Sequence, residues 1–94
     1  MKEQVKVGDI VLSIQGHDKG SYFVVTKIEG NKAFIVDGKK RKFSSIKCKN
    51  IKHLKLVDVM VSKDIINRIQ KGQPVGNKRV YKAIKFQTKK IQED

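Results

Sequence analysis

Residues 5–28 read VKVGDIVLSIQGHDKGSYFVVTKI, and they carry the strongest indication of the fold. Two runs rich in aliphatic and aromatic residues, at residues 9–15 and 21–29, flank a short polar loop between Gly16 and Gly20. β-Branched and aromatic residues favour strands, and glycine permits the positive φ values that a tight loop needs. The stretch therefore predicts a β-hairpin that belongs to a small barrel.

Three further strands are predicted after this hairpin, at residues 32–36, 40–44 and 51–57. Gly30-Asn31 supplies a turn before the strand at residues 32–36, and Asp37-Gly38 supplies a turn after it, because Asn, Asp and Gly tolerate positive φ. Ile10 and Val11 point to opposite faces of the first strand, so one face is expected to meet the core and the other a neighbouring element. Five short strands separated by turns predict a mainly β fold, a small five-stranded barrel.

The apolar periodicity changes after residue 58, which predicts a barrel at residues 1–58 and a basic C-terminal extension at residues 59–94. Two short helices are expected in the extension, at residues 62–71 and 78–92. Ser62 is a suitable N-cap for the first helix, and Asn77 is a suitable cap for the second. The first helix carries an apolar stripe of Ile65, Ile66 and Ile69.

The net charge of +13 resides in the second half of the chain. Residues 1–37 carry five basic and five acidic side chains, residues 38–57 carry eight basic ones and no acid, and residues 58–94 carry nine basic and four acidic ones. Charges of one sign that are packed together repel one another unless an oppositely charged partner relieves the repulsion. The pattern therefore indicates a polyanionic partner, and nucleic acid is favoured over an anionic membrane.

The residue patterns of catalysis and metal binding are missing from the sequence. His17 and His53 are the two histidines, and neither has a metal-ligand spacing. The loop at residues 16–20 lacks the Gly-Lys-Ser/Thr ending of a phosphate-binding loop. Cys48 is expected to be a small, partly buried residue, because no base can be placed beside it. We expect a non-enzymatic protein with no catalytic, cofactor-binding or metal site.

A lysine-rich segment at residues 39–55 is the main candidate binding surface. Its side chains are expected to fan out over one rim, since few lysines can be buried without a partner. Lysine outnumbers arginine nineteen to three in the chain, which favours point-charge contacts with phosphates over bidentate base reading. The basic residues predicted to bind RNA are Lys39, Lys40, Arg41, Lys42, Lys47, Lys49, Lys52 and Lys55.

The aromatic and histidine residues leave alternatives open. Tyr22 either stacks on an exposed base or packs at the edge of the core, and Phe34 and Phe43 are expected in the core. His17 at the loop tip and His53 near the fifth strand either contact RNA or are simply exposed. Because the aromatic residues are too few for a stacking platform, structured RNA is a better expected ligand than a free single strand.

Three segments of the chain resemble a known family. Residues 8–11 (GDIV), residues 16–20 (GHDKG) and the apolar run to Ile28 resemble a KOW motif, which ribosomal proteins and transcription elongation factors carry within an SH3-like barrel. Residues 49–54 (KNIKHL) are similar to the eukaryotic-type large-subunit ribosomal protein fourteen-e family. By position, the resemblance adds to the predicted RNA-binding set the residues Lys19, Ser21 and Asn50.

The resemblance implies an SH3-like KOW barrel that binds ribosomal RNA, either as a ribosomal protein or as a ribosome-associated factor. The alternative is a protein-interaction module of the transcription or translation machinery that uses the barrel and the isoleucine stripe. Duplex DNA binding and membrane-surface binding rank below these. The sequence shows no export signal and no apolar run long enough to cross a bilayer, so we expect a cytoplasmic protein without a membrane partner. It is expected to be monomeric when it is not bound to RNA.

Overall fold

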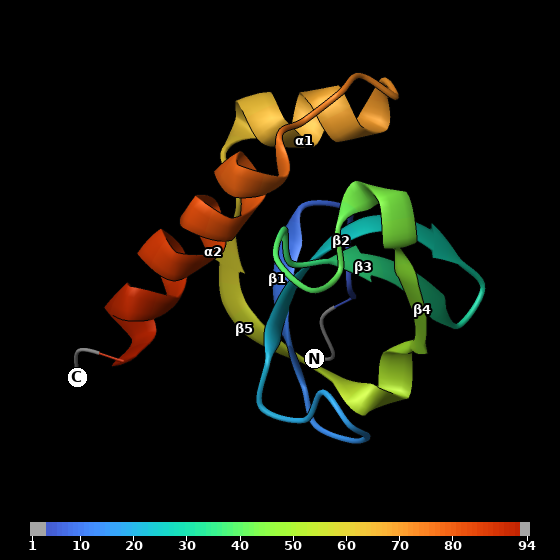
Figure 1. The fold of residues 1–94 in the computed structure, drawn as a ribbon. Coiled ribbons are helices and arrows are strands. Elements are labelled where there is room, and N and C mark those ends of the chain that lie inside the picture. The colour runs from blue at the N-terminus through green and yellow to red at the C-terminus, as the bar shows by residue number, and fades with distance from the viewer. Residues whose placement is uncertain (1–3, 93–94) are drawn as a thin grey trace.

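The computed structural model describes residues 4–92, with the side chains of residues 4–89 (Figure 1). It contains five strands, β1 (Asp9–Ser13), β2 (Tyr22–Glu29), β3 (Lys32–Val36), β4 (Lys47–Asn50) and β5 (Leu54–Met60). The strands form one sheet in the order β4-β3-β2-β1-β5, with every neighbouring pair antiparallel. Helices α1 (Lys63–Gln70) and α2 (Asn77–Gln92) follow the sheet. The predicted mainly β fold of five strands and two C-terminal helices is confirmed.

The hairpin predicted from residues 5–28 forms between β1 and β2. Ile10 lies opposite Val24, and Leu12 lies opposite Tyr22. Beyond the paired residues, the backbone N–H of Gly20 donates to the carbonyl of Ser13 at 2.8 Å and closes the loop. Gly16 and Gly20 both have a φ of +92°, which explains why glycine brackets the loop.

The predicted fourth strand, at residues 40–44, is wrong. Asp37 Oδ1 accepts hydrogen bonds from the backbone N–H groups of Lys39 and Arg41, at 2.9 and 2.8 Å, so the chain curls into a broad loop. A 3₁₀ turn at Phe43–Ser45 follows, and β4 begins at Lys47. A competing local turn around Asp37 therefore replaces the expected two-residue hairpin.

The fifth strand begins later and extends further than predicted. A 3₁₀ turn at Ile51–His53 precedes it, and Asn50 caps this turn by accepting a hydrogen bond from the backbone N–H of Lys52. Strand β5 then runs to Met60, past the predicted domain boundary at residue 58. The outer limits of the two predicted domains, residues 1–3 and 93–94, lie outside the described residues.

The sheet is buried on both of its faces, as the alternation of Ile10 and Val11 predicts. One face packs around a cluster of Val11, Phe23, Val25, Ala33, Ile35 and Leu54. The other face packs against the helices in a second cluster of Ile10, Val24, Val36, Val61, Ile65, Val80 and Ile84. Figure 1 shows α2 beside β5, with β4 on the opposite side of the curled sheet. The helical extension thus forms part of the core.

The two helices follow the sequence prediction closely. Ser62 caps α1 by accepting a hydrogen bond from the backbone N–H of Ile65, whose side chain is buried. Ile66 and Ile69 pack against the second cluster, so the isoleucine stripe faces inward. Asn77, expected to cap α2, instead accepts a hydrogen bond from the Phe43 N–H at 3.0 Å and links the helix to the β3–β4 loop. Within residues 4–92, no helix has the length and apolar character needed to cross a membrane.

Three side chains differ from their expected burial. Phe43 packs against the second cluster, but it is only half-buried. Phe34 is also half-buried, with the Lys27 ammonium 5.8 Å from its ring centroid. Cys48 is exposed rather than partly buried, since it lies on the outward side of the edge strand β4.

Helix α2 packs directly on the backbone of the β3–β4 loop at Gly38. A Cβ at this position would lie 2.1 Å from the backbone oxygen of Asn77 and 2.9 Å from the backbone nitrogen of Tyr81. Gly38 also has a φ of +79°, a conformation that side chains rarely adopt. Glycine is therefore required for the loop and the helix to meet.

We expect Gly38→Ala to lower the free energy of unfolding by about 3 kcal/mol, because the left-handed backbone and the helix contact both oppose a methyl group. Gly72→Ala is the matched control, since Gly72 has a φ of +71° and no atom within 4 Å of an added Cβ. Gly72→Ala should lower the free energy of unfolding by only about 1 kcal/mol. Urea unfolding measures both values. Equal losses would contradict the close approach at Gly38.

Candidate nucleic-acid interface

Asp18 anchors the β1–β2 loop to strand β4. Its Oδ1 accepts hydrogen bonds from Ser13 Oγ at 2.7 Å and Lys49 Nζ at 2.6 Å. Lys49 Nζ also donates to the carbonyl of Gln15. Lys47 Nζ lies 3.2 Å from Oδ2 as an ion pair without the geometry of a hydrogen bond, so Oδ2 has no hydrogen-bond donor among the described residues. These contacts fix the loop that carries His17.

Lys49 does not fan out over the rim as predicted for the lysines of this segment. Its side chain is 8% exposed, because its ammonium turns inward to Asp18. Lys47 is also largely withdrawn, with 26% of its side chain exposed. The acid that holds both lysines is 31 residues from Lys49 in sequence, so local sequence reasoning could not identify it. Lys49 therefore has a structural contact in place of the predicted exposed position.

The environment of Asp18 strongly favours its charged form. Burial by itself would raise the pKa of Asp18, but the hydrogen bonds from Lys49 and Ser13 and the charge of Lys47 outweigh it and hold the pKa far below the ordinary 3.8. A carboxyl group whose pKa is lowered on folding stabilises the folded state above its unfolded pKa. This stabilisation is complete above about pH 5 and is lost as the pH falls below 4.

We expect Asp18→Asn to lower the free energy of unfolding by about 3 kcal/mol at pH 7, because it leaves the Lys49 ammonium buried without a counter-charge. The difference in the free energy of unfolding between wild type and variant should decrease as the pH falls from 5 to 2. Urea unfolding at several pH values measures it. The control is Asp64→Asn, which removes exposed ion pairs to Arg68 and Arg79 and should have a much smaller effect. A stability difference between wild type and Asp18→Asn that does not depend on pH would contradict the stabilising role of the charged Asp18 carboxylate.

The β3–β4 loop presents a run of four exposed basic residues. The turn around Asp37 places them outside the sheet, where none has a carboxylate partner among the described residues. They are Lys39, Lys40, Arg41 and Lys42. This part of the predicted binding surface is therefore exposed and available to a ligand.

Helix α2 adds a second row of lysines beside this loop. A groove of about 520 Å³ lies between the start of β2, the β3–β4 loop and α2, and we call it the tyrosine groove. Its charged and aromatic lining consists of Tyr22, Asp37, Lys39, Lys40, Tyr81, Lys85 and Lys89. The ammonium groups of Lys39 and Lys85 lie 5.5 and 5.6 Å from the ring centroid of Tyr81. Positive charge and aromatic rings thus meet in one groove.

A second hollow adjoins the tyrosine groove, and we call it the hairpin hollow. It has a volume of about 320 Å³ and is lined by His17, Asp18, Ser21, Phe23, Asp37, Lys40, Arg41 and Lys47. The two hollows share Ser21, Asp37 and Lys40. The structure therefore brings the β1–β2 loop, the β3–β4 loop and α2 together into one basic surface.

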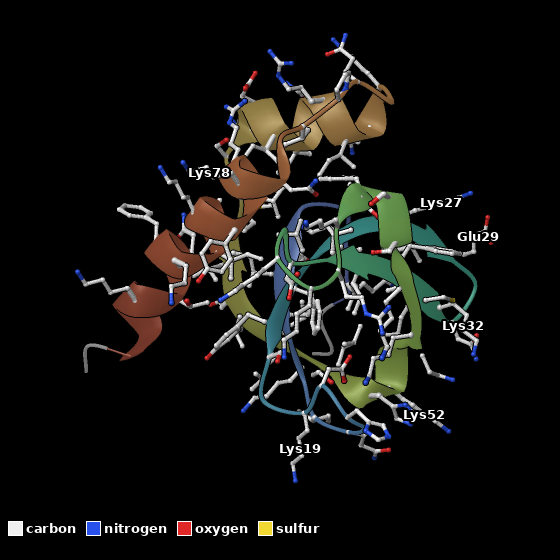
Figure 2. All side chains as sticks on the ribbon, in the orientation of Figure 1. Lys19, Lys27, Glu29, Lys32, Lys52 and Lys78 are labelled. Atoms are coloured by element: carbon white, nitrogen blue, oxygen red, sulfur yellow. The ribbon has the colours of Figure 1, made fainter. Side chains whose placement is uncertain are left out.

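Other predicted residues lie outside both hollows. Asn50 caps a 3₁₀ turn, and the carbonyl of the half-buried His53 accepts a hydrogen bond from the Ile14 N–H. Four predicted residues are exposed and line neither hollow: Lys19, Lys42, Lys52 and Lys55. Figure 2 shows Lys19 and Lys52 at the loop end of the sheet, far from Lys78 on α2. The predicted set is thus only partly gathered in one place.

The sequence indicated that the lysines of the C-terminal extension contact phosphates, but it did not single out the residues that α2 contributes, Tyr81, Lys85 and Lys89. A periodic signal for them is present, because Lys78, Lys82, Lys85 and Lys89 recur at the spacing of one helix face. The spacing does not say which element this face meets. That depends on the contact of α2 with Gly38, which joins residues far apart in the sequence.

A metal-binding group of side chains and a match to a known protein are two further observations that could point to a function. Within the part of the chain that the structure describes, no three His, Cys, Asp or Glu side chains gather into a metal-binding group. No protein-family model matches the chain. No curated protein matches it at a significant level. The basic surface is therefore the feature on which a functional proposal rests.

Proposed function

We propose that this protein is a non-enzymatic RNA-binding protein that docks on structured ribosomal RNA, as a ribosomal protein or a ribosome-associated factor. The observation that carries the proposal is the continuous basic surface of the tyrosine groove and the hairpin hollow. Three separate segments contribute to it: the β1–β2 loop, the β3–β4 loop and α2. A ligand that spans this surface needs repeated negative charge, and an RNA backbone supplies it.

Some lysines form ion pairs with carboxylates of the protein, and others do not, which distinguishes paired lysines from those available to a ligand. Lys47 and Lys49 are held by Asp18, and Lys27 is paired with Glu29. The basic residues of the β3–β4 loop have no such partner among the described residues, so their charge is available to phosphates. Binding of phosphates releases the counterions of the RNA, and this release drives association and makes it dependent on salt.

The strand arrangement supports the proposed SH3-like KOW barrel. Strands β1 to β4 form a meander, and β5 returns to pair with β1 on the other edge of the sheet. The KOW resemblance covers β1, its loop and β2, so the loop of that motif is the one that carries His17 to the hairpin hollow. In this proposal, the loop brings its backbone and His17 close to the RNA.

A protein-interaction module is the weaker proposal, because the apolar stripe that it requires is already occupied. Ile65 is 3% exposed, and Ile66 and Ile69 pack against the sheet. The apolar residues Val80 and Ile84 of α2 are buried in the same cluster. The inward packing of both helices also opposes membrane-surface binding, which needs an outward apolar face.

We expect Lys40→Glu combined with Arg41→Glu to weaken RNA binding by at least about tenfold, because both residues line the basic surface and their phosphate contacts are lost. The slope of log affinity against log salt should fall by about two. The ligand is a labelled fragment of large-subunit ribosomal RNA, and fluorescence anisotropy measures its affinity.

The matched control is Lys32→Glu combined with Lys71→Glu, which changes the charge equally at two exposed lysines outside both hollows. Lys32 lies at the β2–β3 end of the sheet, away from α2 (Figure 2). Equal losses for the two double variants would show that the basic surface is not the binding site. Competition with duplex DNA at the same salt tests whether RNA is preferred.

The cellular test is crosslinking and sequencing of the RNA bound to this protein, together with gradient sedimentation at two salt concentrations. One dominant site in large-subunit ribosomal RNA, with cosedimentation at moderate salt, is the expected result. Absence of bound RNA, with the protein in a light fraction at both salts, would favour the protein-interaction module instead.

A further inference from the structure

We propose that the tyrosine groove holds a single unstacked nucleotide, so that the preferred ligand is a structured RNA with one extruded base. This inference rests on the proposed RNA-binding function and specifies which feature of the RNA is recognised. In the bound state the base lies against Tyr81, and the adjoining phosphates lie among Lys39, Lys40, Lys85 and Lys89.

The shape of the tyrosine groove suits one nucleotide. Its volume of about 520 Å³ lies within the range of about 300–1,000 Å³ that is typical of small-ligand pockets. Tyr22 packs against the second apolar cluster, which lies between the sheet and the helices. Ile84 also lines the groove and is 5% exposed. These residues give the groove a rigid apolar wall. A longer stacking platform would need more aromatic rings than the two tyrosines supply.

The charges of the groove fit the phosphates of that nucleotide. The four lysines of the lining have no carboxylate partner among the described residues. Asp37 is the one acidic side chain described in the lining, and its Oδ1 already accepts two backbone hydrogen bonds that shape the loop. The charged side chains of the lining are therefore four lysines and one aspartate, a net charge of +3. A phosphate between the lysines relieves their repulsion.

The contacts of Tyr81 indicate how the base enters. In the free protein, two lysine ammonium groups lie over its ring, at 5.5 Å for Lys39 and 5.6 Å for Lys85. An exposed cation–π contact is weaker than the stacking of a base on an aromatic ring. When a nucleotide enters, the lysines move from the ring to the phosphates, and the base takes their place. One nucleotide thus provides a base that stacks on the ring and a phosphate that binds the ammonium groups.

A base that is stacked within a duplex cannot reach this ring, because its neighbours cover both of its faces. A bulged or looped-out base exposes a face to the protein, and stacking on aromatic side chains is the usual way in which proteins recognise such bases. The groove therefore distinguishes an RNA that carries an extruded nucleotide from an uninterrupted helix of the same charge.

The experiment uses two RNA hairpins that differ by one bulged nucleotide, with the full-length protein at matched salt. The sequence has no tryptophan and two tyrosines, and both tyrosines line the groove, so intrinsic fluorescence reports on this site alone. We expect the bulged hairpin to bind about tenfold more tightly, the contribution of one stacked base, and to quench tyrosine fluorescence. The uninterrupted hairpin should bind without comparable quenching.

Tyr81→Leu keeps an apolar side chain but removes the aromatic ring, and Tyr81→Phe keeps the ring. The first variant should lose the tenfold preference while its affinity for the uninterrupted hairpin changes less than about twofold. The second should keep the preference, which shows that the ring and not the hydroxyl is needed. Circular dichroism establishes that both variants are folded. If Tyr81→Leu is unfolded, Lys85→Gln takes its place as the test and should reduce the preference for the bulged hairpin.

The outcomes separate this inference from the proposed function. Equal affinity for the two hairpins, or a preference that Tyr81→Leu retains, overturns the nucleotide site and leaves general RNA binding intact. A polyglutamate peptide that quenches tyrosine fluorescence as strongly as the bulged hairpin also overturns it, because the groove would then bind any polyanion. Failure to bind either hairpin even at low salt overturns the proposed function itself.

Discussion

The burial of both faces of the sheet is the constraint on which this structure depends. Ile10 and Val11 are adjacent and both fully buried, one in each apolar cluster. A curled sheet can enclose one face by itself, but the other face needs a cover. Helices α1 and α2 provide it, because Val61, Ile65, Val80 and Ile84 complete the second cluster. The helices are therefore required by the sheet, and their position follows from this requirement.

This packing also determines where the positive charge lies. Once the apolar side of α2 is turned to the sheet, its lysines lie beside the β3–β4 loop, and Gly38 lets the two backbones approach closely. Two basic segments that are separated in sequence are thereby brought together. Like charges oppose this arrangement, so the apolar contacts and the hydrogen bond between Phe43 and Asn77 must outweigh their repulsion.

The lysines of the chain perform two physically different roles. Lys49 is buried, and its ammonium is neutralised by Asp18, so it connects strand β4 to the β1–β2 loop. Lys39 and Lys85 are exposed and lie over the ring of Tyr81. Both kinds occur in basic stretches that look alike in the sequence. Only the ion pair with Asp18, which joins residues distant in the chain, distinguishes Lys49 from Lys39 and Lys85.

The sequence predicts the β1–β2 hairpin, the β3 strand, both helices, the two apolar faces and the segregation of charge, because each depends on local periodicity or composition. It misplaced β4, since the turn around Asp37 competes with a two-residue hairpin, and it started β5 too early. It predicted the lysines of the β3–β4 loop individually as binding residues, but it did not single out Tyr81 or Lys85. That α2 lies beside this loop and that Lys49 turns inward to Asp18 follow from tertiary packing, because both contacts join residues that are distant in the chain.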